Sequence, residues 1–313
     1  MKAITVSEFG GPDVLRVGEA AMPEPGPEEL LVRVLAAGVG PWDASMRRGG
    51  FSGQLPYVPG GEFAGLVVGE TGAFASFDDG APVYGYPALT GCYAEYVTCQ
   101  VEQLAPIPAG LSAVDAAAVP VDGLTAEQGL ADVLGVGPGD QVLIAAGAGG
   151  VGHLAVQIAR ALGATVVATA SPRHHQFLHS LGASVVVDHT RPDWPDQVRD
   201  AMDGGARQVL ACAEPVLEGA ARAARDDAVI ATPVHADLPE DGRVRWQPYD
   251  GKPLGSRLVA MAPWFDAGTL TVSVQARYYL DDAAEAHRKI EEGHTQGKVV
   301  LIVDTDLAAS LEV

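Results

Sequence analysis

The chain has 313 residues, a length that predicts about two domains. Hydrophobic residues make up 48% of it and charged residues 19%, which is typical of a folded protein rather than a disordered one. The formal net charge of −20 would repel nucleic acid phosphates and anionic lipid headgroups, so we expect neither as a partner.

Two further absences narrow the class of protein. The sequence has no apolar run of about 18 residues, and its start lacks the pattern of a secretory signal, so we expect a cytoplasmic protein with no membrane partner. Its three cysteines, Cys92, Cys99 and Cys212, form no Cys-x-x-Cys pair. That spacing argues against a disulfide framework and against a thiolate zinc site.

The first third of the chain reads as short strands separated by turns that contain glycine and proline. The predicted strands cover residues 2–6, 15–20, 30–39, 65–70, 82–87 and 93–99. Closely spaced strands without long helices indicate an antiparallel, barrel-like domain.

From about Pro120 the pattern changes to alternating strands and helices, which is typical of a parallel sheet covered by helices. Strands are predicted at 141–145, 164–170, 184–188, 208–213 and 228–232, and helices at 153–163, 174–182 and 194–202. From Thr269 the chain returns to strands, at 271–280 and 298–304, around a helix at 281–293. We expect this last part to fold back onto the first domain.

A glycine-rich turn lies between the strand at 141–145 and the helix that follows it. Gly147, Gly149 and Gly152 form the pattern G-x-G-x-x-G, which in this context binds the pyrophosphate of a dinucleotide at the helix N-terminus. A chance match in a chain with 38 glycines is the alternative, and the strand–turn–helix context weakens it. No acidic residue occurs between Asp140 and Asp188, where an even distribution would place about six, and this also favours an anionic ligand.

The end of the second strand indicates which dinucleotide binds. An enzyme that prefers NADH usually has Asp or Glu about 20 residues after the first glycine, whereas this strand ends at Ser171, with Arg173 two residues later. A hydroxyl and a guanidinium bind the 2′-phosphate of NADPH, which a carboxylate would repel. NADPH is therefore the expected cofactor. The alternative is that both residues begin a surface helix, since serine is also a good helix N-cap.

Seven sequence blocks, spread in order over nearly the whole chain, carry a family resemblance. They are KAITVSEFGGPDVLRV, EPGPEELLVRVLAAGVGPWDASMRRG, LPYVPGGEFAGLV, YAEYV, VPVDGLTAEQGL, AAGAGGVGHLAVQIARALGA and AEAHRKIEEGHTQGKVVL. With these blocks the chain resembles the quinone oxidoreductase branch of the medium-chain dehydrogenase/reductase superfamily, the branch of NADPH:quinone reductases and zeta-crystallin.

The resemblance implies an α/β protein with two domains and a homodimer. Residues 1–119 and 263–313 would form a GroES-like β-barrel catalytic domain, and residues 120–262 a Rossmann domain with a doubly wound parallel sheet that binds NADPH. Zinc-dependent relatives have a cysteine in the block that runs from Gly38 to Asp43 and a histidine beside the glutamate. This chain has neither, since Gly61 precedes Glu62, so the resemblance implies hydride transfer without a metal.

Several positions match cofactor contacts of the family: the pyrophosphate cradle, a residue near the nicotinamide, the 2′-phosphate pocket and the adenosine end. These positions are Thr125, Gly147, Gly149, Gly150, Val151, Gly152, Ser171, Arg173 and His189. Taken alone, His189 would be interpreted as a surface histidine, as we interpret His174 and His175. Lys298 is shared by the family and is open to a structural or a functional interpretation.

The expected substrate cleft departs from the family pattern. Gly40 replaces an asparagine that lies close to nicotinamide and substrate, and Ser45 replaces a tyrosine found in some members, so two hydrogen-bonding side chains are lost. We assign the lining of the cleft to Gly40, Trp42, Asp43 and Ser45. Trp42 either fills the space or packs in the core. Asp43 is interpreted as a structural anchor rather than a general acid, so no acid or base is assigned.

Three functions remain in competition at this point. The favoured one is transfer of a hydride from NADPH to a quinone or an α,β-unsaturated carbonyl. Small side chains at Gly40 and Ser45 would widen the cleft for a second, an enoyl or polyketide tailoring reductase of secondary metabolism. Loss of the asparagine motivates a third, a non-redox NADPH-binding protein such as a cyclase or a sensor.

Overall fold

The structure is a computed structural model that describes residues 1–50, 54–69, 77–293 and 295–304. The chain divides into two compact units: unit 1 comprises residues 1–121, 253–268 and 272–313, and unit 2 comprises residues 122–252 and 269–271. Glu70, the end of one predicted strand, and residues 305–313 of the predicted catalytic domain lie outside the described residues. Among the described helices, none is long and apolar enough to cross a membrane.

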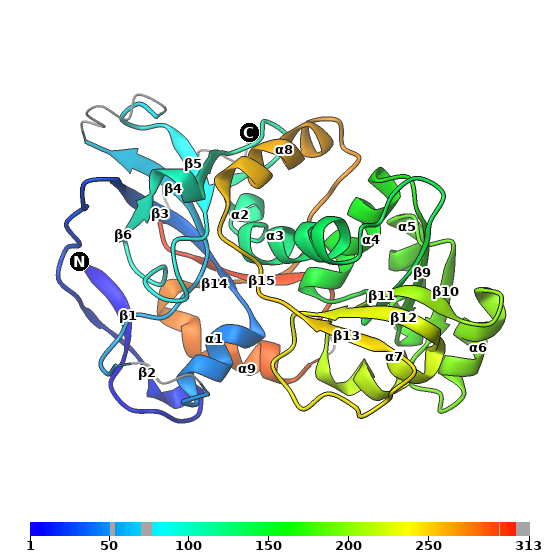
Figure 1. Ribbon diagram of the computed structural model, residues 1–313. Helices are drawn as coiled ribbons and strands as arrows, with labels where there is room; N and C mark the ends of the chain where they lie inside the picture. The colour runs from blue at the N-terminus through cyan, green and yellow to red at the C-terminus, as the bar shows by residue number, and fades with distance from the viewer. Residues whose placement is uncertain (51–53, 70–76, 294, 305–313) are drawn as a thin grey trace. The chain divides into compact units, whose positions relative to one another are not determined.

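Unit 1 is built on a sheet that joins strands from both ends of the chain (Figure 1). The strand order is β14-β15-β3-β4-β5-β7, and β6 also pairs with β3. These strands are β3 (Glu29–Val39), β4 (Phe63–Val68), β5 (Pro82–Gly85), β6 (Tyr96–Gln100), β7 (Leu104–Pro106), β14 (Val274–Tyr279) and β15 (Lys298–Ile302). Because β15 pairs antiparallel with β3, the prediction that the C-terminal part returns to the first domain is confirmed.

The central strand of this sheet is β3. Its first half alternates between half-buried and buried residues, which predicts a strand with one face toward the core. From Val34 to Val39 every residue is buried, so both faces are covered there. Phe63, Val83 and Leu301 belong to the same hydrophobic cluster, which forms the core of unit 1.

The other elements of unit 1 surround this sheet. The paired strands are β1 (Lys2–Val6) and β2 (Leu15–Glu19), and the helices are α1 (Pro41–Arg47), α2 (Ala113–Ala116), α8 (Gly255–Asp266) and α9 (Ala283–Glu291). Helix α9 packs against β14 and β15 and also contacts α1. Only α9 was predicted: α1 and α2 are too short to show a helical period in the sequence, and α8, which contains Pro263, was also missed.

Unit 2 contains a sheet of six parallel strands in the order β10-β9-β8-β11-β12-β13. They are β8 (Gln141–Ala145), β9 (Thr165–Ala170), β10 (Val185–Asp188), β11 (Ala206–Ala211), β12 (Ala224–Thr232) and β13 (Arg245–Pro248). The strand order reverses between β8 and β11, and ligands of such sheets bind beside the carboxyl ends of strands at that point. The prediction of a Rossmann-type sheet is confirmed, although β13, with its exposed residues, was missed.

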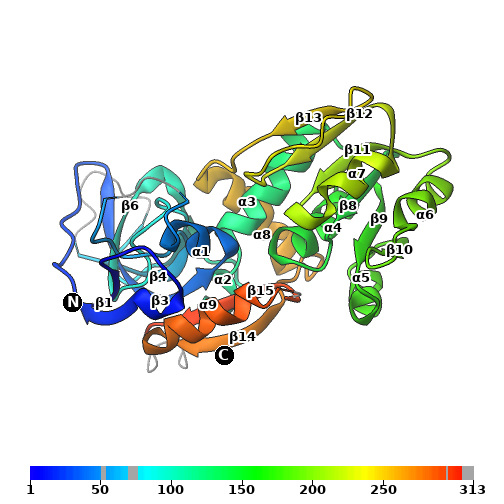
Figure 2. The same ribbon diagram turned by 90° about the horizontal axis from the view of Figure 1, so that it is seen from below.

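Five α-helices are described in the region of this sheet: α3 (Pro120–Gln128), α4 (Gly150–Ala161), α5 (His175–Ser180), α6 (Trp194–Ala201) and α7 (Leu217–Ala223). Helix α4 packs on β8 and β9, whereas α6 and α7 pack on each other, with α7 also on β11 and β12 (Figure 2). Trp194 and Leu217 from these two helices meet Leu143, Val209 and Ile230 of the sheet in one hydrophobic cluster.

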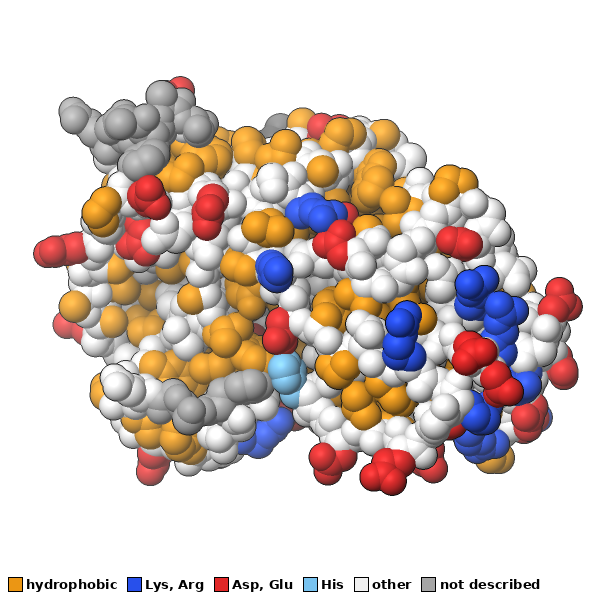
Figure 3. All heavy atoms as spheres, in the orientation of Figure 1, with side chains coloured by type: hydrophobic (Ala, Val, Ile, Leu, Met, Phe, Trp, Pro, Cys, Tyr) orange, Lys and Arg blue, Asp and Glu red, His pale blue; other side chains and the backbone are white. Residues whose placement is uncertain are grey.

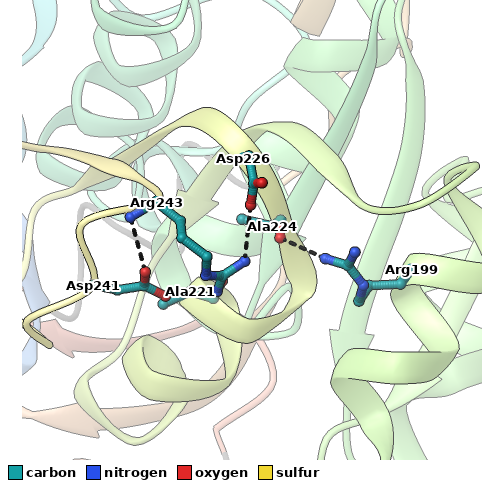
Figure 4. A network of polar contacts seen from close by, with 6 residues as sticks. All are labelled: Arg199, Ala221, Ala224, Asp226, Asp241 and Arg243. Atoms are coloured by element: carbon teal, nitrogen blue, oxygen red, sulfur yellow. Dashed lines mark hydrogen bonds and ion pairs between the residues drawn. The ribbon is translucent and has the colours of Figure 1, made fainter.

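Two arginines make polar contacts around β12 and the segment that leads into β13 (Figure 4). Arg243 donates to Asp241 at 2.6 Å and to Asp226 at 3.3 Å, and Arg199 donates to the carbonyl oxygen of Ala224 at 2.8 Å. Figure 3 shows basic side chains of unit 2 lying among acidic ones on the face that it draws. Paired surface charges of this kind add little stability.

Candidate functional site

The glycine-rich turn leaves the sheet at the carboxyl end of β8. The Gly147 N–H donates to the carbonyl oxygen of Thr169 at 2.8 Å, and the Ala146 N–H donates to Thr169 Oγ1 at 3.1 Å. These two bonds tie the turn to β9. Ala146 has a φ of 63°, in the left-handed region that residues with a Cβ rarely adopt. Such strain is typical of functional turns that the surrounding structure holds in place.

The glycines of the turn meet two different steric needs. A Cβ on Gly152 would overlap the Ala146 carbonyl oxygen and lie 2.7 Å from Gly147 Cα, so Gly152 allows the helix to pack on the turn. A Cβ on Gly149 would meet only the Ala146 carbonyl oxygen, at 3.8 Å. Gly149 therefore faces open space, as the close approach of a pyrophosphate to the backbone requires.

The electrostatics of α4 fit the same ligand. This helix of 12 residues, all of them described, begins after Gly149 and has no acidic residue in its first turn. Its N–H groups and dipole therefore favour an anion. His153 Nδ1 lies 2.7 Å from the carbonyl oxygen of Gly150 and 3.0 Å from that of Gly149, and its ring stacks on Phe177. The residues of the turn thus fit the pyrophosphate of a dinucleotide.

One acidic residue at this turn was missed. Asp122 of α3 is 7% exposed, and a Cβ on Gly150 would overlap its Oδ2 atom. The stretch from 141 to 187 is free of acidic residues, but the fold brings a carboxylate to the turn from an earlier part of the chain. Nothing in the sequence indicates this approach. A carboxylate there disfavours a second anion.

Residues of the predicted 2′-phosphate pocket follow two adjacent strands. Asp188 of β10 is opposite Ala170 of β9, so Ser171 and His189, the next residues, lie at the same edge of the sheet. Ser171 precedes a 3-10 helix at 172–174, but its side chain makes no capping hydrogen bond, which weakens the alternative that it serves as a cap. The Asp188 carboxylate accepts hydrogen bonds from the Thr190 N–H and hydroxyl, which lower its pKa.

The surroundings of Arg173 correct one interpretation. His174 was expected at the surface, but it is buried, and its Nε2 accepts a hydrogen bond from Arg173 Nε at 3.2 Å. His175 is half-buried, with Nε2 3.2 Å from the carbonyl oxygen of Ala170. The pattern of adjacent histidines did not reveal that one ring turns inward to contact the arginine.

Thr125 lies one helical turn beyond Asp122 on α3 and is buried. Its carbonyl oxygen accepts a hydrogen bond from the Tyr249 hydroxyl at 2.8 Å. A Cβ on Gly251 would lie 2.6 Å from Thr125 Oγ1, so the Gly251 backbone rests directly on this hydroxyl. That Thr125 lies near the nicotinamide of a bound cofactor stays a prediction.

In unit 1 the candidate residues begin where β3 ends. Gly40 is the N-cap of α1, and its N–H donates to Asp43 Oδ2 at 2.8 Å. Asp43 is 5% exposed, and burial raises the pKa of its carboxyl to about 6, although the Gly40 N–H, the Lys298 charge and the Tyr93 hydroxyl act in the opposite direction. Burial thus shifts the titration of Asp43 toward pH 6.

A buried ion pair lies beside Asp43. Lys298 Nζ is 2.6 Å from Glu62 Oε1, and both side chains are almost fully buried. Glu62 Oε2 also accepts a hydrogen bond from the Val121 N–H at 2.8 Å. Gly38 makes room for the pair, because a Cβ there would overlap Glu62 Oε1 and lie 2.7 Å from the Ala117 carbonyl oxygen.

This donor set does not fit zinc. The ammonium of Lys298 already neutralises Glu62. Burial raises the thiol pKa of Cys92 and of Cys99, so neither offers a thiolate. Within the described ranges, no group of three or more His, Cys, Asp or Glu side chains could hold a metal ion.

The remaining candidates lie on α1, and further polar residues surround it. Trp42 and Ser45 are half-buried, and Ser45 packs against Gly50, whose N–H donates to the Ser45 carbonyl oxygen at 2.9 Å. The Tyr93 hydroxyl lies 3.4 Å from His287 Nε2, and burial lowers the His287 pKa to about 3. The structure therefore brings Gly40, Asp43 and Lys298 together, and a substrate-lining role for Trp42 and Ser45 stays a prediction.

Comparison with known proteins gives the family. Residues 26–109 match the family model described as the alcohol dehydrogenase GroES-like domain, and residues 162–301 match the one described as zinc-binding dehydrogenase. Quinone oxidoreductase of Pongo abelii is 28% identical over 97% of this chain and 98% of its own length. The chloroplastic NADPH-dependent alkenal/one oxidoreductase of Arabidopsis thaliana is 31% identical over 96% of this chain and 79% of its own length.

The chain belongs to the quinone oxidoreductase branch of the medium-chain dehydrogenase/reductase superfamily. A solved member, Escherichia coli quinone oxidoreductase in complex with NADPH, superposes with a TM-score of 0.87 at 25% identity and covers 97% of this chain and 100% of its own. Membership in this branch confirms the predicted fold class, a GroES-like domain with a Rossmann domain.

Proposed function

We propose that this chain is an NADPH-dependent oxidoreductase that transfers a hydride to a quinone or an α,β-unsaturated carbonyl compound without zinc. Residues of the predicted Rossmann domain, 120–262, would bind the cofactor, and those of 1–119 and 263–313 the acceptor. The names of the relatives favour this activity over a tailoring reductase or a non-redox protein. We also propose a cytoplasmic homodimer, as the resemblance implies.

The observation that carries the proposal is the glycine turn at the point where the strand order of the parallel sheet reverses. Gly152 is required by packing within the protein and Gly147 is closely packed, with Ala168 Cβ 3.2 Å from its Cβ position, whereas the approach to Gly149 is open. In our proposal Gly149, Gly150, Val151 and Gly152 hold the pyrophosphate with backbone N–H groups at the start of α4.

The choice of NADPH rests on the edge of the sheet beyond β9. Ser171 and Arg173 would bind the 2′-phosphate with a hydroxyl and a guanidinium, and His189 would contact the adenosine end. Thr125 would contact the nicotinamide. The bound cofactor supplies a hydride from C4 of that ring, while Gly40, Trp42, Asp43 and Ser45 line the acceptor site and keep water from it.

Steady-state NADPH oxidation tests the proposal. The purified protein should oxidise NADPH in the presence of benzoquinones, naphthoquinones or simple enones, and mass spectrometry should show that the product has gained two hydrogens. NADH should be a poorer donor, with a KM at least about tenfold higher, because it lacks the 2′-phosphate. Tight NADPH binding without turnover on any of these acceptors would favour a non-redox protein.

A further inference from the structure

The space beside Gly40, which follows β3, differs from that beside Gly38 within the strand. Gly38, two residues earlier and inside β3, has no room for a Cβ, because it would overlap Glu62 Oε1. A Cβ on Gly40 would have only two neighbours within 4 Å, Lys298 Nζ at 3.5 Å and Asp43 Oδ2 at 3.9 Å. Apart from the chain neighbours of Gly40, the nearest atoms of the described residues are thus polar and belong to an ammonium and a carboxyl group.

The charges around this space depend on Asp43. Lys298 and Glu62 together are neutral, so the group of three carries one negative charge when Asp43 is ionised and none when it is protonated. An acceptor that gains a hydride becomes an oxyanion. A lysine N–H stabilises an oxyanion best when no second carboxylate stands beside it.

We propose that the space beside Gly40 is an oxygen subsite, in which Lys298 donates a hydrogen bond to the carbonyl oxygen of the acceptor and Asp43 sets the charge of the subsite. This inference rests on the proposed function. In the family pattern an asparagine stands at the position of Gly40. In this chain Lys298 would provide the hydrogen bond, and Gly40 would leave room for the carbonyl oxygen. The subsite takes ketones and quinones whose carbonyl oxygen is accessible at the end of the molecule.

The proposed reaction consists of hydride transfer to the acceptor followed by protonation. The acceptor receives a hydride at its electrophilic carbon, the electron pair of its C=C or C=O bond moves to oxygen, and the nicotinamide is oxidised. The oxyanion remains hydrogen-bonded to Lys298 until it takes a proton from solvent. Lys298 keeps its protons and Glu62 stays ionised throughout, so Lys298 acts through its charge and its N–H.

Protonation of Asp43 should therefore favour the reaction. Burial raises the Asp43 pKa to about 6, and kcat should fall as pH rises through that value. The titratable groups that face Asp43 are Lys298 on β15, Tyr93 and Cys92 before β6, and Tyr57 before β4. Of these, Lys298 carries a charge at neutral pH, and burial raises the pKa of the two tyrosines and of Cys92, so they remain neutral in this range.

Gly40→Ala is the first test, because a methyl group fits beside Lys298 Nζ at an ordinary contact distance. It should fold with an unchanged melting temperature and lower kcat/KM for the acceptor at least about tenfold, since it fills the subsite. Its Kd for NADPH should change less than about twofold. Gly18→Ala is a matched control, because its Cβ would also lie 3.5 Å from its nearest neighbour, Thr5 Oγ1 on β1. This variant should leave kcat/KM unchanged.

Removal of both charges is the second test. Lys298→Met alone would leave Glu62 buried without its cation, so we pair it with Glu62→Gln. The double variant should lower kcat about 100-fold, the scale of one lost oxyanion donor, while NADPH still binds. Asp43→Asn should lose the decrease in kcat above pH 6, because an amide stays neutral over this range.

The outcomes separate this inference from the proposed function. A wild-type protein that binds NADPH but reduces no acceptor refutes both. A wild-type protein that turns over, with Gly40→Ala and the double variant equally active, refutes the oxygen subsite and leaves the proposed function standing. A kcat that decreases above pH 6 in Asp43→Asn as it does in wild type refutes the role of Asp43.

Discussion

The glycine turn of unit 2 and the polar cluster of unit 1 are built in opposite ways. The turn uses consecutive residues, from Ala146 to Gly152, and acts through backbone geometry. The cluster collects Gly40, Asp43, Glu62 and Lys298 from three separate parts of the chain and acts through buried charge. Substitutions in the turn should therefore act by steric overlap, and substitutions in the cluster by electrostatics.

The largest effect is expected inside the turn. Gly152→Ala places a Cβ against the Ala146 carbonyl oxygen and 2.7 Å from Gly147 Cα, so the turn must move. NADPH binding should weaken more than about 100-fold in a fluorescence titration, because the N–H groups lose their alignment. Gly149→Ala is the matched control for folding, since its Cβ would meet protein only at 3.8 Å.

Gly149→Ala should keep the melting temperature of wild type and still lose affinity for NADPH, because its Cβ occupies the space reserved for the pyrophosphate. If Gly152→Ala binds NADPH as wild type does, the turn does not hold the cofactor. The conclusion that substitutions in the turn act by steric overlap would then be wrong.

The next effect concerns the stability of unit 1 as a function of pH. The Asp43 pKa is 3.8 in the unfolded chain and about 6 in the fold, so folding favours the protonated form. Its contribution is complete below pH 4 and is lost as pH rises through 6, by about 3 kcal/mol for two pKa units. Urea unfolding of wild type and Asp43→Asn at pH 4 and pH 7 measures it.

Wild type should lose about 3 kcal/mol of unfolding free energy relative to Asp43→Asn over this range. A difference between the two proteins that stays constant with pH would show that Asp43 is ionised in the fold throughout. The charge of the cluster would then be fixed rather than variable.

A smaller effect is expected at the edge of the sheet in unit 2. Arg173→Ala should weaken NADPH binding about 10- to 30-fold and leave NADH binding unchanged, because one charge-assisted contact to the 2′-phosphate is lost. Arg191→Ala is the control, since Arg191 is exposed and paired with Asp193 at 3.0 Å. Equal losses for the two cofactors would mean that Arg173 does not read the 2′-phosphate.

The smallest effect tests whether electrostatics also acts at the turn. Asp122→Asn removes a negative charge next to Gly150 and should tighten NADPH binding about fivefold, or roughly 1 kcal/mol. Isothermal titration at low salt measures the change. Weaker binding in this variant would mean that Asp122 holds the turn in shape. The turn would then act through geometry alone, in contrast to the charged cluster of unit 1.

The sequence predicted most of the parallel sheet and the whole glycine turn, because both depend on consecutive residues. Period and glycine spacing indicate β8 and α4 directly. The missed features depend on contacts between distant residues. Asp122 reaches the turn from α3, His174 turns inward to Arg173, and Lys298 pairs with Glu62 across the sheet of unit 1. No local pattern encodes such contacts.

The same reasoning explains the helices. α1 was missed because a helix of seven residues spans about two turns and shows no clear period, although Asp43 accepts a hydrogen bond from its N-cap, Gly40. The positions of Gly40 and Asp43 in the sequence were noted, but the nearness of Lys298 was not, because β15 pairs with β3 only in the folded chain.

The most direct test of the central claim is transfer of deuterium from NADPH labelled at C4 of the nicotinamide. With one of the two stereospecifically labelled forms, the saturated ketone formed from an enone should contain one carbon-bound deuterium from the cofactor, detected by mass spectrometry, and the other form should give unlabelled product. Saturated ketone without deuterium from either form, or no reduced product at all, would contradict direct hydride transfer by this protein.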